Sequence, residues 1–185
     1  MDELSKILSL ILPILMPGLA LIAVLKLKLL TSLDIPLDLG ITLNGKRIFG
    51  ENKTLKGVFV MMFAATLVSS ALYFSYWSGY ALYISPVFSK SPILIGTIYS
   101  FSYILGELIN SFVKRQLNIS SGKITLSKFR NLQEFFDLSD GIIVAVISLL
   151  YFTTASVNQV LTAGFIGIFL HYGTDLFMKR LRLKH

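Results

Sequence analysis

The sequence of 185 residues has few charged side chains and no cysteine. Charged residues make up 15% of the chain, whereas soluble domains carry charge at roughly a quarter of their positions. The mean hydropathy is +0.72. Without cysteine, the chain has no disulfides, no thiolate metal ligands and no cysteine nucleophile. The composition argues against a soluble globular protein, a disordered chain and a coiled coil.

Charge is missing from long continuous stretches. No Asp, Glu, Lys or Arg occurs in residues 7–25, 57–89, 91–106 or 141–174. Runs of about 18 or more apolar residues match a bilayer core roughly 30 Å thick. We therefore predict an all-α integral membrane protein, a single transmembrane domain over residues 1–185 that is a bundle of five helices. The predicted spans are 4–25, 57–78, 92–113, 141–155 and 160–178; the fourth is short and could begin earlier.

The remaining charges are distributed unevenly, with a formal net charge of +7. Lys and Arg gather in residues 26–56, in residues 114–140 and after the last span, and only Lys6 and Lys90 fall on the other side. Cytoplasmic loops of membrane proteins collect Lys and Arg. We therefore expect a multi-pass protein of the cell membrane with its N-terminus outside, its C-terminus in the cytoplasm and two basic cytoplasmic loops. Orientation and anionic lipid headgroups account for the basic excess, so no nucleic acid is expected as a partner.

The third span carries a polar face. Glu107, Asn110, Ser111 and Lys114 are spaced i, i+3, i+4 and i+7, which places them on one side of a helix. Glu107 lies roughly 10 Å inside the cytoplasmic end at about 1.5 Å of rise per residue. A charge at this depth is costly and marks a functional site by default. The alternative is that the face supplies hydrogen bonds that hold the helices together.

Further carboxylates reach a similar depth. Asp137 and Asp140 are three residues apart at the predicted start of the fourth span. Asp140 alone would suit an N-cap, but a pair of aspartates favours a metal site, and hard oxygen ligands favour Mg²⁺. His171 and Asp175, four residues apart in the fifth span, could bind metal or serve as structural partners.

The first basic loop contains a glycine-flanked Lys-Thr pair, Lys53-Thr54, between Gly50 and Gly57. It is not a P-loop, because Asn52 occupies the position where that motif requires glycine. Glycines with Lys and Thr just before a helix can still form a phosphate-binding turn, since backbone N–H groups there attract anions. Carboxylates for a cation beside basic residues for an anion are the combination that phosphoryl transfer requires.

Two segments resemble a known family. They are Gly106-Glu107-Leu108-x-Asn110-Ser111-Phe112-x-Lys114-Arg115-x-x-Asn118-Ile119 and Gln133-x-Phe135-Phe136-Asp137-x-x-Asp140-Gly141. Together they resemble the CTP-dependent cytidylyltransferases of membrane lipid synthesis. The loop element around Lys53, the small size and the five spans are most similar to the archaeal branch, the CDP-archaeol synthases. Glu107 and Leu138, where the bacterial signature has Asp and Arg, also favour that branch.

The resemblance implies that CTP and an unsaturated archaetidic acid, an isoprenoid glyceryl ether phosphate, react with Mg²⁺ in the bilayer to give CDP-archaeol and pyrophosphate. The active site would face the cytoplasm. We expect Asp137, Asp140 and Glu107 to hold the metal. The residues expected to act on the phosphates or to bind the nucleotide are Lys114, Arg115, Lys53, Thr54, Lys56, Asn110, Ser111 and Asn118.

Two alternatives remain at this stage. A small ion- or proton-coupled transporter would use Glu107 and Asp175 in its pathway, with acidic residues at the midplane and access from both faces. The intramembrane charges instead lie toward one end of the predicted bundle. The second alternative is another lipid-phosphate enzyme, such as a CTP-dependent prenol kinase or a CDP-alcohol phosphotransferase. The spaced aspartates of the latter family are missing, because no acidic residue occurs between Asp140 and Asp175.

Overall fold

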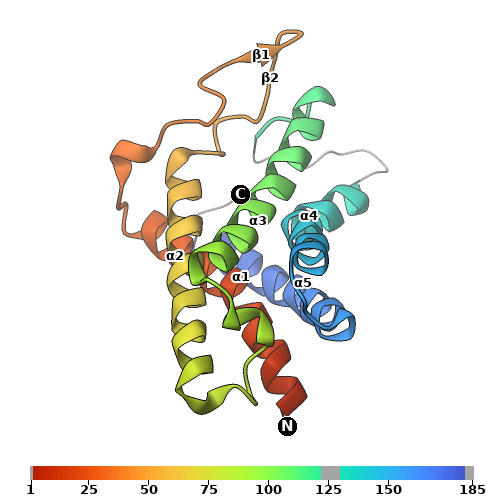
Figure 1. The fold of residues 1–185 in the computed structure, drawn as a ribbon. Coiled ribbons are helices and arrows are strands. Elements are labelled where there is room, and N and C mark those ends of the chain that lie inside the picture. The colour runs from red at the N-terminus through yellow and green to blue at the C-terminus, as the bar shows by residue number, and fades with distance from the viewer. Residues whose placement is uncertain (1, 122–129, 182–185) are drawn as a thin grey trace.

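Five long helices form the molecule in the computed structural model, which describes residues 2–121 and 130–181 (Figure 1). The helices are α1 (Asp2–Lys26), α2 (Leu55–Ser75), α3 (Pro92–Gln116), α4 (Arg130–Phe152) and α5 (Val157–Arg180). All 5 are long and apolar enough to cross a membrane, by length and composition. The prediction of an all-α membrane bundle is therefore confirmed. Part of the second predicted basic loop, residues 122–129, lies outside the described residues.

The fourth helix starts earlier than the uncharged run that predicted it. It begins at Arg130 instead of 141 and ends at Phe152, where the Thr153 hydroxyl accepts a hydrogen bond from the Ala155 amide at 3.2 Å. Asp137 and Asp140 therefore lie inside the helix, and the N-cap interpretation of Asp140 is wrong. The physical reason is that a helix can continue beyond an apolar layer with polar side chains, whereas a search for uncharged residues detects only the apolar part.

The core lies toward the N-terminal end of α1. Helix α3 packs against α2 on one side and α4 on the other, while α1 packs against α2 and α5. Between α2 and α3 the chain forms a π-helical turn, η2 (Tyr76–Tyr80), and a 3₁₀ turn, η3 (Pro86–Ser89). The largest fully buried side chains of this core are Tyr99, Phe88, Leu10, Ile95, Val87 and Val160. Close van der Waals packing of this kind is what holds membrane helices together.

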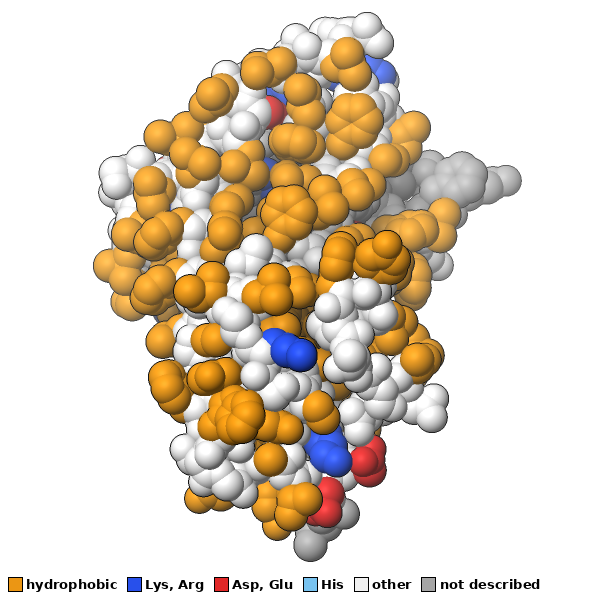
Figure 2. Space-filling view, in the orientation of Figure 1, with side chains coloured by type: hydrophobic (Ala, Val, Ile, Leu, Met, Phe, Trp, Pro, Cys, Tyr) orange, Lys and Arg blue, Asp and Glu red, His pale blue; other side chains and the backbone are white. Residues whose placement is uncertain are grey.

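The outward-facing side chains are mostly apolar. Phe63, Leu67, Phe101 and Phe165 are all at least 60% exposed, and hydrophobic side chains cover most of the face shown in Figure 2. A soluble monomer rarely exposes a continuous apolar surface of this extent. The surface therefore suits contact with lipid.

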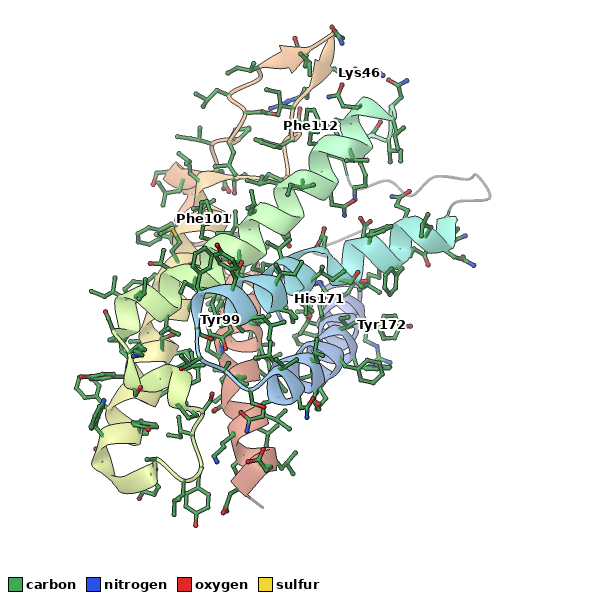
Figure 3. All side chains as sticks on the ribbon, turned by 45° about the vertical axis from the view of Figure 1, so that its right-hand side comes forward. Lys46, Tyr99, Phe101, Phe112, His171 and Tyr172 are labelled. Atoms are coloured by element: carbon green, nitrogen blue, oxygen red, sulfur yellow. The ribbon has the colours of Figure 1, made fainter. Side chains whose placement is uncertain are left out.

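Residues 27–54 cover one end of the bundle, here called the loop end, where α2 begins and α3 finishes. They include a 3₁₀ turn, η1 (Thr31–Leu33), and a hairpin of β1 (Thr42–Leu43) and β2 (Lys46–Arg47). Asn44 and Gly45 join these strands with φ of 52° and 75°, the positive values that a tight two-residue hairpin requires. Lys46 Nζ donates to the Gln116 carbonyl at 2.6 Å, so the hairpin caps the C-terminus of α3 (Figure 3).

Candidate active site

Two glycines allow α3 and α4 to cross closely near the loop end. A Cβ atom at Gly106 would overlap the Asp140 carbonyl, and one at Gly141 would lie 2.7 Å from the Tyr103 ring. Real Cβ atoms do not approach other atoms this closely. The two helices can therefore cross here only because Gly106 and Gly141 have no side chain. The close approach brings the polar face of α3 against the aspartates of α4.

Asn110 connects the two aspartates at this crossing. Its Nδ2 amide donates to Asp137 Oδ1 and to Asp140 Oδ2, both at 2.7 Å. Lys114, one turn further along α3, places its Nζ 2.7 Å from the same oxygen of Asp137. The side chains of Lys114 and Asp137 are 19% and 22% exposed, so this pair remains within reach of solvent and of a polar ligand.

A second ion pair joins the loop to α3. Lys53 Nζ lies 2.5 Å from Glu107 Oε2, and the two side chains are 26% and 32% exposed. The backbone holds Lys53 in place, because its carbonyl accepts from the Leu37 amide at 2.8 Å and the Leu55 amide donates to Ile35 at 2.9 Å. Loop residues far apart in sequence therefore fix a cation over the polar face of α3.

Six of the predicted site residues thus come together from the loop, α3 and α4. We call them the carboxylate–lysine network: Lys53, Glu107, Asn110, Lys114, Asp137 and Asp140. Within residues 2–121 and 130–181, no group of three His, Asp or Glu side chains converges as a ready metal centre. Two carboxylates bridged by a neutral amide nevertheless fit a Mg²⁺-type ion, which usually binds one or two protein carboxylates plus substrate phosphates.

Other predicted site residues have structural roles near the network. Thr54 is the N-cap of α2, and its hydroxyl accepts from the Gly57 amide at 3.4 Å. Lys56 is buried, 3% exposed, with its Nζ 2.7 Å from Asp34 in the loop. Asn118 has a left-handed φ of 60° just beyond α3, where such residues terminate helices. Ser111 is buried in α3.

Arg115 points toward the loops, although it follows Lys114 directly. It is 8% exposed, and its Nη1 donates to Ser121 Oγ at 2.7 Å. Gly50, with a φ of 94°, lies against this pair so closely that a Cβ would overlap the serine hydroxyl. Among the residues that the structure describes, the Arg115 Nε has no hydrogen-bond partner. The guanidinium therefore packs the loop against α3 and leaves one buried donor unpaired among the described residues.

The sequence analysis missed Asp38, a buried carboxylate that organises the loop. It accepts hydrogen bonds from the amides of Phe49 at 3.1 Å and Gly50 at 2.8 Å, and it pairs with Arg47. Burial alone would raise the pKa of Asp38, but the hydrogen bonds from Arg47 and the backbone amides hold this pKa well below its usual range. The same contact raises the pKa of Arg47. A sequence signal existed, because Asp38 also accepts from the Gly40 amide at 3.1 Å, and Asp often forms such a turn with the backbone two residues further on.

The structure gives His171 and Asp175 separate partners. His171 Nδ1 lies 3.0 Å from the Tyr103 hydroxyl, between α5 and α3 (Figure 3). Asp175 is 6% exposed, and one of its carboxylate oxygens is 2.8 Å from Lys179 Nζ within α5. These contacts support the interpretation of the two residues as structural partners.

Comparison with known proteins identifies the family to which this chain belongs. A family model described as "CarS-like: CDP-archaeol synthase" matches residues 4–185. The chain belongs to the CDP-archaeol synthase family. A CDP-archaeol synthase of Thermococcus kodakarensis is 26% identical over 154 residues, covering 80% of each chain. One of Saccharolobus islandicus is 28% identical over 152 residues, covering 81% of this chain and 80% of the relative.

A solved structure shares the fold. It is described as "Structural insight into an intramembrane enzyme for archaeal membrane lipids biosynthesis", with a TM-score of 0.59, 22% identity, and coverage of 88% of this chain and 91% of that one. This likeness concerns the fold. The family model and the curated relatives confirm the predicted membership of the CDP-archaeol synthase family, a family of CTP-dependent cytidylyltransferases, and they set the transporter alternative aside.

Proposed function

We propose that this chain transfers the cytidylyl group of CTP to an unsaturated archaetidic acid, 2,3-bis-O-geranylgeranylglyceryl phosphate, at the carboxylate–lysine network. An oxygen of the lipid phosphate attacks the α-phosphorus of CTP, the bond to the bridging oxygen of the β-phosphate breaks, and pyrophosphate leaves. The lipid phosphate is largely ionised near neutral pH, since its second pKa is about 6. The reaction therefore requires positioning and charge neutralisation but no protein nucleophile.

The observation that carries the proposal is the alternation of lysines and carboxylates around Asn110. Lys53 and Glu107 are paired, as are Lys114 and Asp137. When CTP binds, its phosphates compete for the two lysines and thereby release the two carboxylates. Asp137 and Asp140, with Glu107 as a third ligand, would then hold Mg²⁺, which neutralises phosphate charge and orients the phosphates. Arg115 lies at the same end of α3 with its Nε buried and unpaired among the described residues, and it stays a prediction as a phosphate ligand.

The remaining parts of the proposal concern the other predicted ligand residues and the orientation of the bundle in the membrane. Lys56, Thr54, Ser111 and Asn118 stay predictions as ligands of nucleotide or phosphate. The concentration of Lys and Arg at the loop end supports a cytoplasmic orientation for it, where CTP is present. The N-terminus is then outside, and the lipid reaches the network from the surrounding bilayer.

The test is an assay of the purified protein in detergent with α-labelled CTP, Mg²⁺ and archaetidic acid, with the lipid product separated by chromatography. We expect a labelled CDP-lipid whose formation depends on Mg²⁺. Asp137→Asn and Asp140→Asn keep the side-chain shape but remove the charge, and each should lower kcat by roughly 100-fold or more, as loss of a major electrostatic contact does.

Glu134→Gln provides the matched control, because Glu134 lies on α4 one turn before Asp137 and pairs with Arg130 instead of the network. Its kcat should stay within about twofold of the wild type. Absence of a labelled lipid from the wild-type reaction would reject the proposed reaction. Full activity in both aspartate variants would reject the proposed site.

A further inference from the structure

We propose that an apolar groove between α1 and α2 binds one isoprenoid hydrocarbon chain of the lipid substrate; this inference rests on the proposed function and specifies where the lipid lies. The groove has a volume of about 350 Å³. Its lining is apolar throughout and includes Ala20 and Val24 of α1, Leu30 of the loop, and Phe59, Phe63 and Ala64 of α2.

The walls of the groove suit a flexible hydrocarbon. The rings of Phe59 and Phe63 are nearly parallel, with centroids 6.2 Å apart and an angle of 8° between their planes. Val60, between these two residues in the sequence, is buried and also lines the groove. Ala20 and Ala64 face the space with the shortest apolar side chains, which leaves room between the helices. The stacked rings and the small side chains of the lining offer dispersion contacts to a hydrocarbon chain but no polar partner.

Leu30, which lines the groove from the loop, has an unfavourable backbone conformation. Its φ of 53° and ψ of 39° are left-handed, which costs a non-glycine residue about 1–2 kcal/mol. Such residues persist where the surrounding structure holds them, and they gather at ligand sites. Here the conformation places a leucine over the groove just before η1.

Charged residues lie just beyond the apolar lining at the loop end of the bundle. Lys56, paired with Asp34, precedes Phe59 by one turn of α2, and Lys53 with its partner Glu107 lies just before the helix. A lipid with its chain against Phe59 and Phe63 would therefore have its glyceryl phosphate toward the segment that carries Lys53, whose side chain is 26% exposed, while the buried Lys56 holds that segment through Asp34. The apolar groove and the cations complement the two parts of one amphipathic molecule.

The first test fills the groove. Ala64→Phe should raise KM for the geranylgeranyl substrate about tenfold, equivalent to about 1.4 kcal/mol. The KM for CTP should not change, and a glyceryl phosphate with short saturated chains should react as in the wild type. Ala71→Phe is the matched control, because Ala71 is an exposed alanine two turns further along α2 and outside the groove. It should leave all these values unchanged.

The second test needs no turnover. An archaetidic acid analogue with a diazirine on one chain should crosslink to the peptide that contains Phe59 and Phe63, and the crosslink should disappear in Ala64→Phe but persist in Ala71→Phe. Even labelling of all lipid-facing helices, or labelling insensitive to Ala64→Phe, would show ordinary bilayer contact and overturn the inference. Failure of the reaction with every lipid would reject the proposed function, whereas the crosslinking would still decide the groove.

Discussion

The two halves of α3 have opposite environments. In the first half, Ile95 and Tyr99 are each 1% exposed, and the Tyr99 ring stacks on Phe88 with centroids 6.3 Å apart. In the second half, Glu107 and Lys114 hold ion pairs with the loop and with α4. The first half is surrounded by packed apolar side chains, whereas the second makes polar contacts with other elements.

The comparison shows how one helix both stabilises the bundle and supplies a site. Partly buried ion pairs contribute little net stability, because desolvation offsets most of their attraction. The polar half must therefore be positioned by its apolar continuation and by the close crossing at Gly106. Damage to the first half should reduce stability, whereas damage to the second should reduce turnover.

The largest effect is expected where the two halves meet. Gly106→Ala would force α3 away from the Asp140 carbonyl, and overpacking of this kind costs about 1–3 kcal/mol. We expect a lower melting temperature in detergent together with weaker turnover, because the same shift separates Asn110 from the aspartates. Gly173→Ala on α5, where no atom lies within 4 Å of the added Cβ, should lower neither quantity, because alanine favours a helix more than glycine does. Equal behaviour of the two variants would contradict a crossing that depends on Gly106.

Removal of one cation should affect the polar half alone. Lys53→Ala should raise KM for CTP about tenfold, or about 1.4 kcal/mol, with little change in melting temperature. Lys90, in the connection before α3, is the control, since Lys90→Ala should leave KM for CTP unaltered. Steady-state kinetics with varied CTP measure both. Similar shifts in the two variants would argue against the loop end as the nucleotide site.

A substitution in the apolar half of α3 should have the opposite result: lower stability with unchanged turnover. The Tyr99 hydroxyl donates to the Leu10 carbonyl at 3.0 Å in the core, so Tyr99→Phe should lower the free energy of unfolding by about 1 kcal/mol. Turnover at a temperature well below the melting point should not change. A loss of kcat without a loss of stability would show that the two halves are not separable in this way.

The smallest effect concerns pH and the loop that positions Lys53. Because the pKa of Asp38 is held below its usual range, its stabilisation is fully present above about pH 4 and is lost as pH falls further toward the folded-state pKa. Hydrogen exchange should show that protection of the Phe49 and Gly50 amides, corrected for intrinsic rates, declines in that acidic range. Asp38→Asn should have weaker protection at neutral pH and a flatter profile. Constant wild-type protection across the acidic range would contradict this account.

The sequence predicted the helices better than their ends. Uncharged runs located all five spans, because a bilayer imposes a length on apolar segments. The same criterion missed the start of α4 at Arg130, since polar residues such as Gln133 continue the helix without apolar character. The hairpin was also missed, although Asn44-Gly45 is a strong turn signal, because the absence of charge locates membrane spans but gives no information on local structure in a charged loop.

The site was predictable where residues share one helix face. The spacing of Glu107, Asn110 and Lys114 placed them together, and the helix geometry required it. The partners across elements were not predictable, because the pairing of Lys56 with Asp34 depends on the path of the loop. Thr54 and Asn118 illustrate another limit, since a side chain before or after a helix has the same sequence signature whether it caps the backbone or binds a ligand.

The contact between Lys46 and the Gln116 carbonyl has a consequence for biosynthesis. The hairpin leaves the ribosome 70 residues before its acceptor on α3, and Lys53 likewise precedes Glu107 by 54 residues. When only the first two helices have been made, Lys46 and Lys53 are present but the Gln116 carbonyl and Glu107 are not. Both contacts require α3, so the loop can reach its final form only after the third helix has been made.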